Sequence, residues 1–233
     1  MSGKRVCDIS CEAMHEFALV LDKAGFNADL VQAIINSKGN KHAKAMYIAV
    51  TNGLTVGKLL FTTQTGIAVY DCGDYFRFTL PATDGTTGED WIKRLGSNIG
   101  DCAKQVLRSP DFKPTSGVMT EVAVLKGMLF EDNDRVTKKI RAEADKRKLS
   151  KPNAELACLI CDNFTNEEIG AMGLWYIVAM HKPINDSGGD PSLLHAHRSD
   201  GGRWLRAYYV RPAYRWNRDS GFAFAVSQVS SQH

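Results

Sequence analysis

Leu174-Trp-Tyr-Ile-Val-Ala-Met180 is a nearly all-apolar run that follows Gly173, where the preceding helix is expected to end. A short apolar run of this kind is typical of a strand that is buried on both faces. We therefore expect these residues to form a central strand of a sheet. The longer apolar run from Ala171 to Met180 is far too short to cross a bilayer as a helix.

Three further strands are expected after this run, over residues 192–198, 204–210 and 222–226. Asp200-Gly-Gly202 is a tight-turn signal between the first two of them. Because the connections are short, the four strands predict an antiparallel meander. Phe222–Val226 alternates large and small residues, so one face fills a core and the other allows close packing.

Helices are expected on the N-terminal side of the run. Thr165 and Glu168 have the spacing of a capping box, and Asp134 is expected to cap a charged helix over residues 135–149. A hairpin is expected from Ile67–Tyr70 and Tyr75–Leu80. Further helices are expected at residues 10–25, 27–35, 42–52, 87–95, 101–107 and 152–160, and a strand at 118–125.

The fold class that follows is α+β, with N-terminal helices, a small β-hairpin and a C-terminal, mainly antiparallel sheet with flanking helices. A domain boundary is placed in Ser109–Ser116, where two prolines flank a polar stretch. This gives a mostly helical segment, 1–112, and a segment of helices plus sheet, 113–233. A single compact domain stays open as an alternative.

The composition is that of a globular chain of 233 residues, 44% hydrophobic and 24% charged, with a formal net charge of +3. These values exclude a disordered or collagen-like chain. No apolar signal-peptide core follows Met1, so we expect a cytoplasmic protein without membrane association. No P-loop, dinucleotide-binding glycine motif, nucleophile elbow or zinc-protease motif is present, and no cofactor is expected.

Positive charge is concentrated between Arg135 and Lys151, which carry eight basic and two acidic residues, so the rest of the chain is net negative. Spaced cations on a helix can hold a phosphate backbone. The alternative is an ordinary solvated helix. The candidate binding residues on this helix are Lys138, Lys139, Arg141, Lys146, Arg147 and Lys148.

Arginines and aromatic residues alternate in the C-terminal region, where a sheet could stack bases and hold phosphates. The alternative is that the aromatic residues belong to the core and that the arginines extend along its surface to solvent. The candidate binding residues here are Arg206, Arg211, Arg215 and Trp216.

His195 and His197 lie on the same side of an expected strand, at a spacing that can bind zinc or another divalent ion. Such a site needs a further ligand, for which His181, Asp190 and Asp200 are the candidates. Cys158 and Cys161 have a C-x-x-C spacing within an apolar helix, which buried free thiols explain better than a metal.

Several segments of the second half resemble a family of hypothetical proteins from candidate-phyla bacteria, over residues 87 to 229. The segments are Arg135–Leu149, Pro152–Ile160, Met172–Ile184, Gly202–Leu205 and Gly221–Phe224. The resemblance implies a bacterial, cytoplasmic protein. No function is assigned to that family, so the resemblance implies none here.

Three functions stay open on these observations. The leading hypothesis is a non-catalytic binding or assembly protein that contacts nucleic acid, or another acidic partner, through the basic helix and the arginine-aromatic sheet. The second is a metal-dependent enzyme centred on His195 and His197. The third is a purely structural homo-oligomer, with the small-residue face of Phe222–Val226 as its contact.

Overall fold

The computed structural model describes residues 57–210 and 214–226. The chain divides into two compact units, Met1–Lys58 and Leu59–His233. The helices expected before residue 57 lie outside the described residues.

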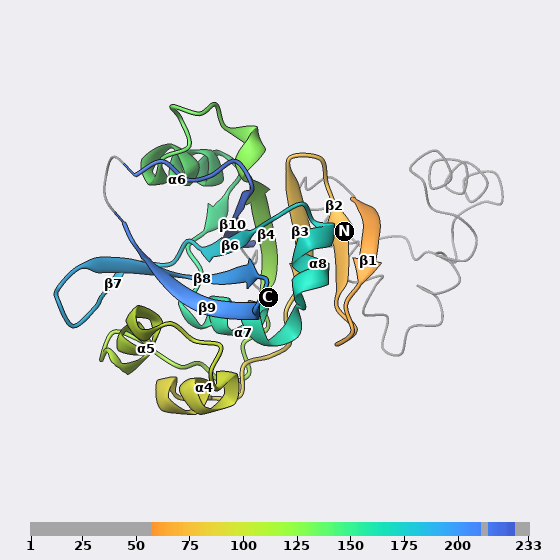
Figure 1. Ribbon diagram of the computed structural model, residues 1–233. Helices are drawn as coiled ribbons and strands as arrows, with labels where there is room; N and C mark the ends of the chain where they lie inside the picture. The colour runs from red at the N-terminus through yellow and green to blue at the C-terminus, as the bar shows by residue number, and fades with distance from the viewer. Residues whose placement is uncertain (1–56, 211–213, 227–233) are drawn as a thin grey trace, which may run out of the picture. The chain divides into compact units, whose positions relative to one another are not determined.

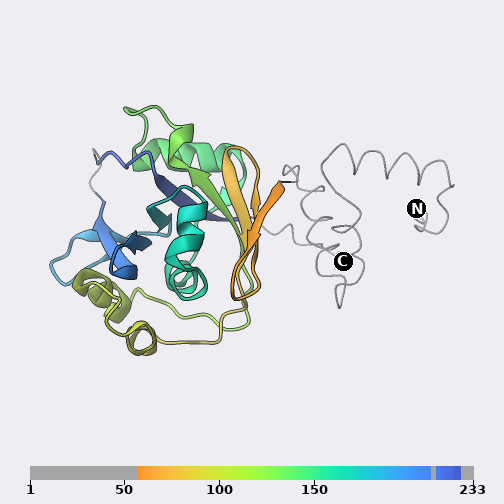
Figure 2. The same ribbon diagram turned by 45° about the vertical axis from the view of Figure 1, so that its right-hand side comes forward.

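A large mixed sheet of ten strands forms the centre of the second unit (Figure 1). Eight strands follow one another in the order β1-β2-β3-β4-β10-β6-β8-β7, while β5 pairs with β10 and β9 pairs with β8. Figure 2 shows β1 at the outer edge of the sheet. The strands are β1 Lys58–Thr62, β2 Ala68–Asp71, β3 Tyr75–Thr79, β4 Glu121–Lys126, β5 Leu149–Ser150, β6 Tyr176–Ala179, β7 Ile184–Asn185, β8 Pro191–Ser199, β9 Gly202–Tyr209 and β10 Ser220–Val226.

The apolar run does form a central strand, β6, between β10 and β8. β6, β8 and β9 are antiparallel neighbours, as expected. The last step of the expected meander is wrong, because β10 lies on the other side of β6, parallel to it and antiparallel to β4. Ala223 and Phe224 point to opposite faces and are both buried, and a strand without a polar face is best placed inside a sheet. On the small-residue face expected as an oligomer contact, Ala223 is fully buried within the unit and Ala225 is partly buried.

The sheet continues across the boundary expected in Ser109–Ser116. β3 precedes that segment and pairs with β4 after it, in antiparallel register from Tyr75↔Leu125 to Thr79↔Glu121. The compact unit begins at Leu59 and includes both strands.

Five helices flank the sheet within the described ranges: α4 Gly88–Leu95, α5 Asp101–Arg108, α6 Thr137–Lys146, α7 Glu155–Asn163 and α8 Asn166–Ala171. A 3-10 turn, η3, spans Gly127–Leu129. Figure 1 shows α6 on one side of β10 and β4, and α4, α5 and α7 on the other. α7 packs against β6, β8 and β9, and α5 packs against β8 and β9. This arrangement confirms the α+β class, a mainly antiparallel sheet with flanking helices.

The side of the sheet that α5 and α7 cover holds the main core. Ile177, Leu194 and Leu205 face it from β6, β8 and β9, and Ile160 and Phe164 from α7 and its end are fully buried. α7 also carries Cys158 and Cys161, which are buried free thiols, as the sequence predicts. No helix in the described part of the chain is long and apolar enough to cross a membrane.

Several local signals are confirmed. The helix expected at 87–95 is α4, and the Thr87 side chain caps it by accepting from the Asp90 amide at 3.3 Å. Thr165 and Glu168 form the expected capping box at α8. β2 and β3 form the expected hairpin around the turn that contains Gly73, at a φ of +84°.

Candidate functional site

The basic helix is shorter than the sequence predicts, because α6 spans only Thr137–Lys146. Its N-cap is Val136 without a side-chain bond, so the expected Asp134 cap is wrong. Asp134 accepts instead from the ammonium of Lys139. The carboxylate is thereby drawn to a side chain of the first turn rather than to a backbone amide.

Three of the six candidate cations of this region are already paired inside the unit. Lys146 and Arg147 both contact Glu143, with Nε of Arg147 2.8 Å from its carboxylate. Arg147 also reaches Asp74 at 3.0 Å, and Lys139 pairs with Asp134. Ion pairs of this kind reduce the charge available to an outside partner.

The other three candidate cations of this region are Arg141, Lys148 and Lys138. Arg141 is partly buried and donates to the His181 carbonyl at 3.0 Å. Its burial lowers its pKa. Lys148 follows the helix at a φ of +56° and is exposed. Lys138 is exposed and has no acidic partner among the residues described.

The two basic regions of the sequence meet at Arg135 and Trp216. The Trp216 amide donates to the Arg135 carbonyl at 2.8 Å, and the guanidinium of Arg135 donates to the Trp216 carbonyl at 3.3 Å. The indole Nε1 of Trp216 donates to the Thr137 hydroxyl at 3.0 Å. Val136 and Arg215 form a bridge beside these bonds. The N-terminus of α6 and the segment at 214–216 are therefore fastened together.

The candidate residues of the C-terminal region have different surroundings. Arg206 is exposed on β9, with its guanidinium carbon 5.3 Å from the centre of the Trp204 ring. Arg215 is exposed, whereas Arg211 lies outside the described residues. Trp216 is only 3% exposed and packs among other rings, so it offers no free face for a base.

His195 and His197 lie on one face of β8, with ring centroids 6.1 Å apart. Tyr176 of β6 stacks on His197 at 4.7 Å, with 23° between the ring planes, and Tyr208 of β9 lies 4.9 Å from His195. Neither ring nitrogen of His195 has a partner of hydrogen-bonding geometry, although the ring is only 1% exposed. The expected pair is thus in place within an aromatic cluster.

Burial dominates the protonation of these rings. Desolvation lowers the pKa of His195 to about 3, and repulsion from His197 and Arg206 acts in the same direction. The Leu193 backbone opposes this shift weakly. Desolvation and Arg206 also lower the pKa of His197. Both imidazoles are neutral near pH 7 and can act as ligands or hydrogen-bond donors.

None of the three residues considered as a further metal ligand joins the histidine pair. His181 uses both ring nitrogens: Nε2 accepts from the Leu194 amide at 3.0 Å, and Nδ1 contacts the Lys182 carbonyl at 2.6 Å. Asp190 and Asp200 are exposed at turns. No group of three or more His, Cys, Asp or Glu residues capable of holding a metal occurs in the part of the chain that the structure describes.

The aromatic cluster joins the histidines to the basic junction. Tyr208 contacts Tyr214 at 5.4 Å and Trp216 at 5.5 Å, and Trp216 contacts Phe222 at 5.8 Å. Desolvation, followed by the hydrogen bond to Tyr208, raises the pKa of Tyr214. The two candidate sites of the sequence are therefore neighbours on one face of the sheet.

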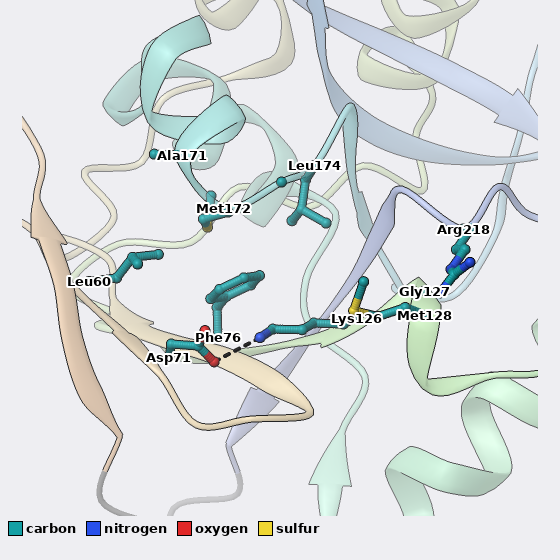
Figure 3. Close-up of a pocket in the computed structure, with 11 residues that line it drawn as sticks. Leu60, Asp71, Phe76, Lys126, Gly127, Met128, Ala171, Met172, Leu174 and Arg218 are labelled. Atoms are coloured by element: carbon teal, nitrogen blue, oxygen red, sulfur yellow. Dashed lines mark hydrogen bonds and ion pairs between the residues drawn. The ribbon is translucent and has the colours of Figure 1, made fainter.

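A hollow of about 310 Å³ lies elsewhere in the unit (Figure 3). Its walls are mostly apolar, and Lys126 extends across it to pair with Asp71 at 2.7 Å. The Lys126 ammonium also lies 4.3 Å from the centre of the Phe76 ring. Its charge is therefore compensated by groups of the hollow itself. The lining residues are Leu60, Asp71, Phe76, Lys126, Gly127, Met128, Ala171, Met172, Gly173, Leu174 and Arg218.

Sequence reasoning missed this hollow and the contact of Tyr176 with His197. The hollow is formed by residues from five separate parts of the chain, which no local spacing connects. Strand alternation places Trp204 on the same face as Arg206, and the structure agrees.

Comparison of the chain with protein-family models, with curated proteins and with solved structures finds no match.

Proposed function

We propose that this chain is a cytoplasmic, non-catalytic protein that binds nucleic acid. The observation that carries the proposal is the junction of Arg135 and Trp216, which fastens the two basic regions to each other. Lys138 follows the Val136–Arg215 bridge by two residues, and Arg215 is part of it. Both cations are exposed, and neither has an acidic partner among the residues described. Unpaired cations on rigid, joined elements are what phosphate contacts require.

Arg206 lies on β9 and extends this surface onto that strand. The aromatic contacts of Tyr208 with Trp216 connect β9 to the junction. Arg206 is exposed and has no ion-pair partner in the described part of the chain. The binding surface we propose is defined by Lys138, Arg206 and Arg215.

The test is binding of a fluorescein-labelled mixed-sequence 20-mer, single- and double-stranded, measured by anisotropy across a salt series. We expect the double variant Lys138→Glu, Arg215→Glu to bind at least tenfold more weakly and to lower the salt slope by about two, one for each phosphate contact. A matched control, Lys58→Glu with Lys113→Glu, makes the same charge change at exposed lysines away from the junction. Equal weakening by the two double variants, or no binding by the wild type at low salt, would refute the proposal.

A metal-dependent enzyme is the second candidate, because His195 is buried and neither ring nitrogen has a partner of hydrogen-bonding geometry among the described residues. Structural zinc takes four ligands, and this pair supplies two. Elemental analysis of the purified chain, compared with His195→Ala, His197→Ala, tests the idea. Stoichiometric metal that disappears in the double variant supports it, and metal-free wild-type protein excludes a tightly bound ion.

A further inference from the structure

Three aromatic side chains stand in a row across three neighbouring strands. Tyr176 of β6 is the register partner of His197 of β8, and His197 is the register partner of Trp204 of β9. Directly opposed residues of neighbouring strands point to the same face. Tyr176, His197 and Trp204, called here the aromatic row, therefore share one face of the sheet.

The next position along the same face adds a cation. Val178, His195 and Arg206 are register partners on the same three strands. His195 is buried and Arg206 is exposed. The guanidinium of Arg206 leans back over Trp204, 5.3 Å from the ring centre. The aromatic row thus ends on β9 in an arginine-tryptophan pair that is open to solvent.

The rings of the row differ in what they already contact. Tyr176 and His197 stack on each other. Trp204 is in no ring–ring contact within the described part of the chain, and the guanidinium of Arg206 lies over its indole. It is partly exposed. Trp204 is therefore the ring of the row whose face is not used by another ring.

We infer that the aromatic row binds single-stranded nucleic acid, with an unpaired base stacked on Trp204 and Arg206 on the neighbouring phosphate. The inference rests on the proposed function and names the class of nucleic acid for it. Every base has a π-face that stacks on an aromatic side chain, and a duplex hides these faces between its pairs. A row across three strands spans about 10 Å, since strands lie about 4.8 Å apart, which suits two or three nucleotides.

The charge at the β9 end of the row suits this partner. Arg206 is a positive neighbour of both histidines, whereas the carboxylate of Asp219 acts on Tyr176 at the β6 end. Arginine is suited to such a place because it stacks on a ring and pairs with phosphate through the same planar group.

The experiment compares four fluorescein-labelled probes with the full chain: dT20, rU20, a 20-bp duplex, and an abasic 20-mer that keeps the phosphates but has no bases. We expect dT20 and rU20 to bind more tightly than the duplex and the abasic strand. Trp204→Ala should weaken dT20 binding about five- to 100-fold, as loss of one stacked base does, and leave abasic binding unchanged. The rU20 and dT20 arms show whether the 2′-hydroxyl contributes.

Trp175 provides the matched control. It is 37% exposed and carries Arg198 over its ring at 4.3 Å, yet it is not part of the row. Trp175→Ala should leave dT20 binding within about twofold. Trp204→Phe keeps an aromatic face and should restore most of the binding that Trp204→Ala loses. Quenching of tryptophan fluorescence by dT20 in the Trp175→Phe chain tests the contact without altering the row.

The outcomes separate the inference from the proposed function. Equal binding of dT20 and the abasic strand, with a salt slope still present, overturns the inference and leaves nucleic-acid binding in place. Equal losses in Trp204→Ala and Trp175→Ala also overturn it, as does an absence of quenching at a dT20 concentration that saturates anisotropy. No binding of any probe overturns both.

Discussion

The backbone and side chain of Arg135 both bond to the backbone of Trp216, although the two residues are 81 positions apart in the chain. The Trp216 amide donates to the Arg135 carbonyl, and the Arg135 guanidinium donates back to the Trp216 carbonyl. The same guanidinium donates to the carbonyls of Gly127 and Phe130, each at 2.9 Å. A residue of the basic segment therefore serves as a buried connector rather than as a contact for a partner.

Arg135→Met is expected to lower the free energy of unfolding by about 3 kcal/mol or more, because three carbonyls lose a donor. Each buried carbonyl that loses its donor costs about 1–3 kcal/mol, and methionine offers no replacement. Urea unfolding followed by circular dichroism measures the change. Lys138→Met is the control, because Lys138 is exposed and a surface change of this kind should stay within about 0.5 kcal/mol. Similar losses in the two variants would contradict the connector role.

Glu168→Ala should destabilise the chain more than Thr165→Ala. Thr165 caps α8 by accepting from the Glu168 amide at 3.2 Å, and loss of such a cap costs about 1 kcal/mol. The Glu168 carboxylate accepts from two amides, those of Thr165 and Gln64, each at 2.7 Å. Its removal therefore also frees the turn between β1 and β2. Thermal unfolding of the two variants gives the order, and a larger effect of Thr165→Ala would show that the Gln64 bond contributes nothing.

Local sequence signals predicted the elements of the fold better than their order in the sheet. The capping box at Thr165 and the hairpin around Gly73 depend on residues close in the chain, and both are confirmed. The position of β10 depends on which strand it meets after folding. Ala223 and Phe224 show that it needs cover on both faces, which excludes an edge but does not choose between neighbours. The two-residue strands β5 and β7 carry too few residues for a pattern.

The sequence predicted which residue types form the candidate site. It did not predict which of these side chains are buried. Strand alternation correctly places His195 and His197 on one face. It does not show that His181 already uses both ring nitrogens in backbone contacts, or that Trp216 is enclosed by Tyr208 and Phe222. A charged sequence also does not show its ion pairs. Glu143 neutralises two of the predicted cations because helical spacing brings them to it.

The cysteines should differ in reactivity toward iodoacetamide. Cys102 is exposed, whereas Cys158 and Cys161 are buried in α7. Burial raises the pKa of Cys161 to about 11 and that of Cys158 well above its usual range, so neither forms a thiolate at pH 8. Timed alkylation followed by peptide mass spectrometry should modify Cys102 before the α7 pair and leave that pair intact until the chain unfolds. In urea all three should react at similar rates, and early labelling of Cys158 in native protein would contradict its burial.

Acid should destabilise the chain through its buried histidines. The pKa of His195 is about 3 and that of His181 about 4 in the folded state, against about 6.5 when unfolded. Since the folded pKa values are depressed, the unfolded chain binds the extra protons. The stability from each histidine is full above about pH 6.5 and is lost as the pH falls toward the folded pKa, at about 1.4 kcal/mol per pH unit.

His195→Phe isolates one of these contributions. Phenylalanine cannot titrate, and it fills an aromatic site where the imidazole nitrogens have no partners. The difference in unfolding free energy between wild type and variant should shift in favour of the variant by about 1.4 kcal/mol per unit as the pH falls from 6 to 4.5. That window lies above the range in which most carboxylates titrate. A difference that stays constant with pH would mean that His195 is protonated in the folded chain, and therefore that the cluster of Tyr176, His197 and Tyr208 admits water to its ring.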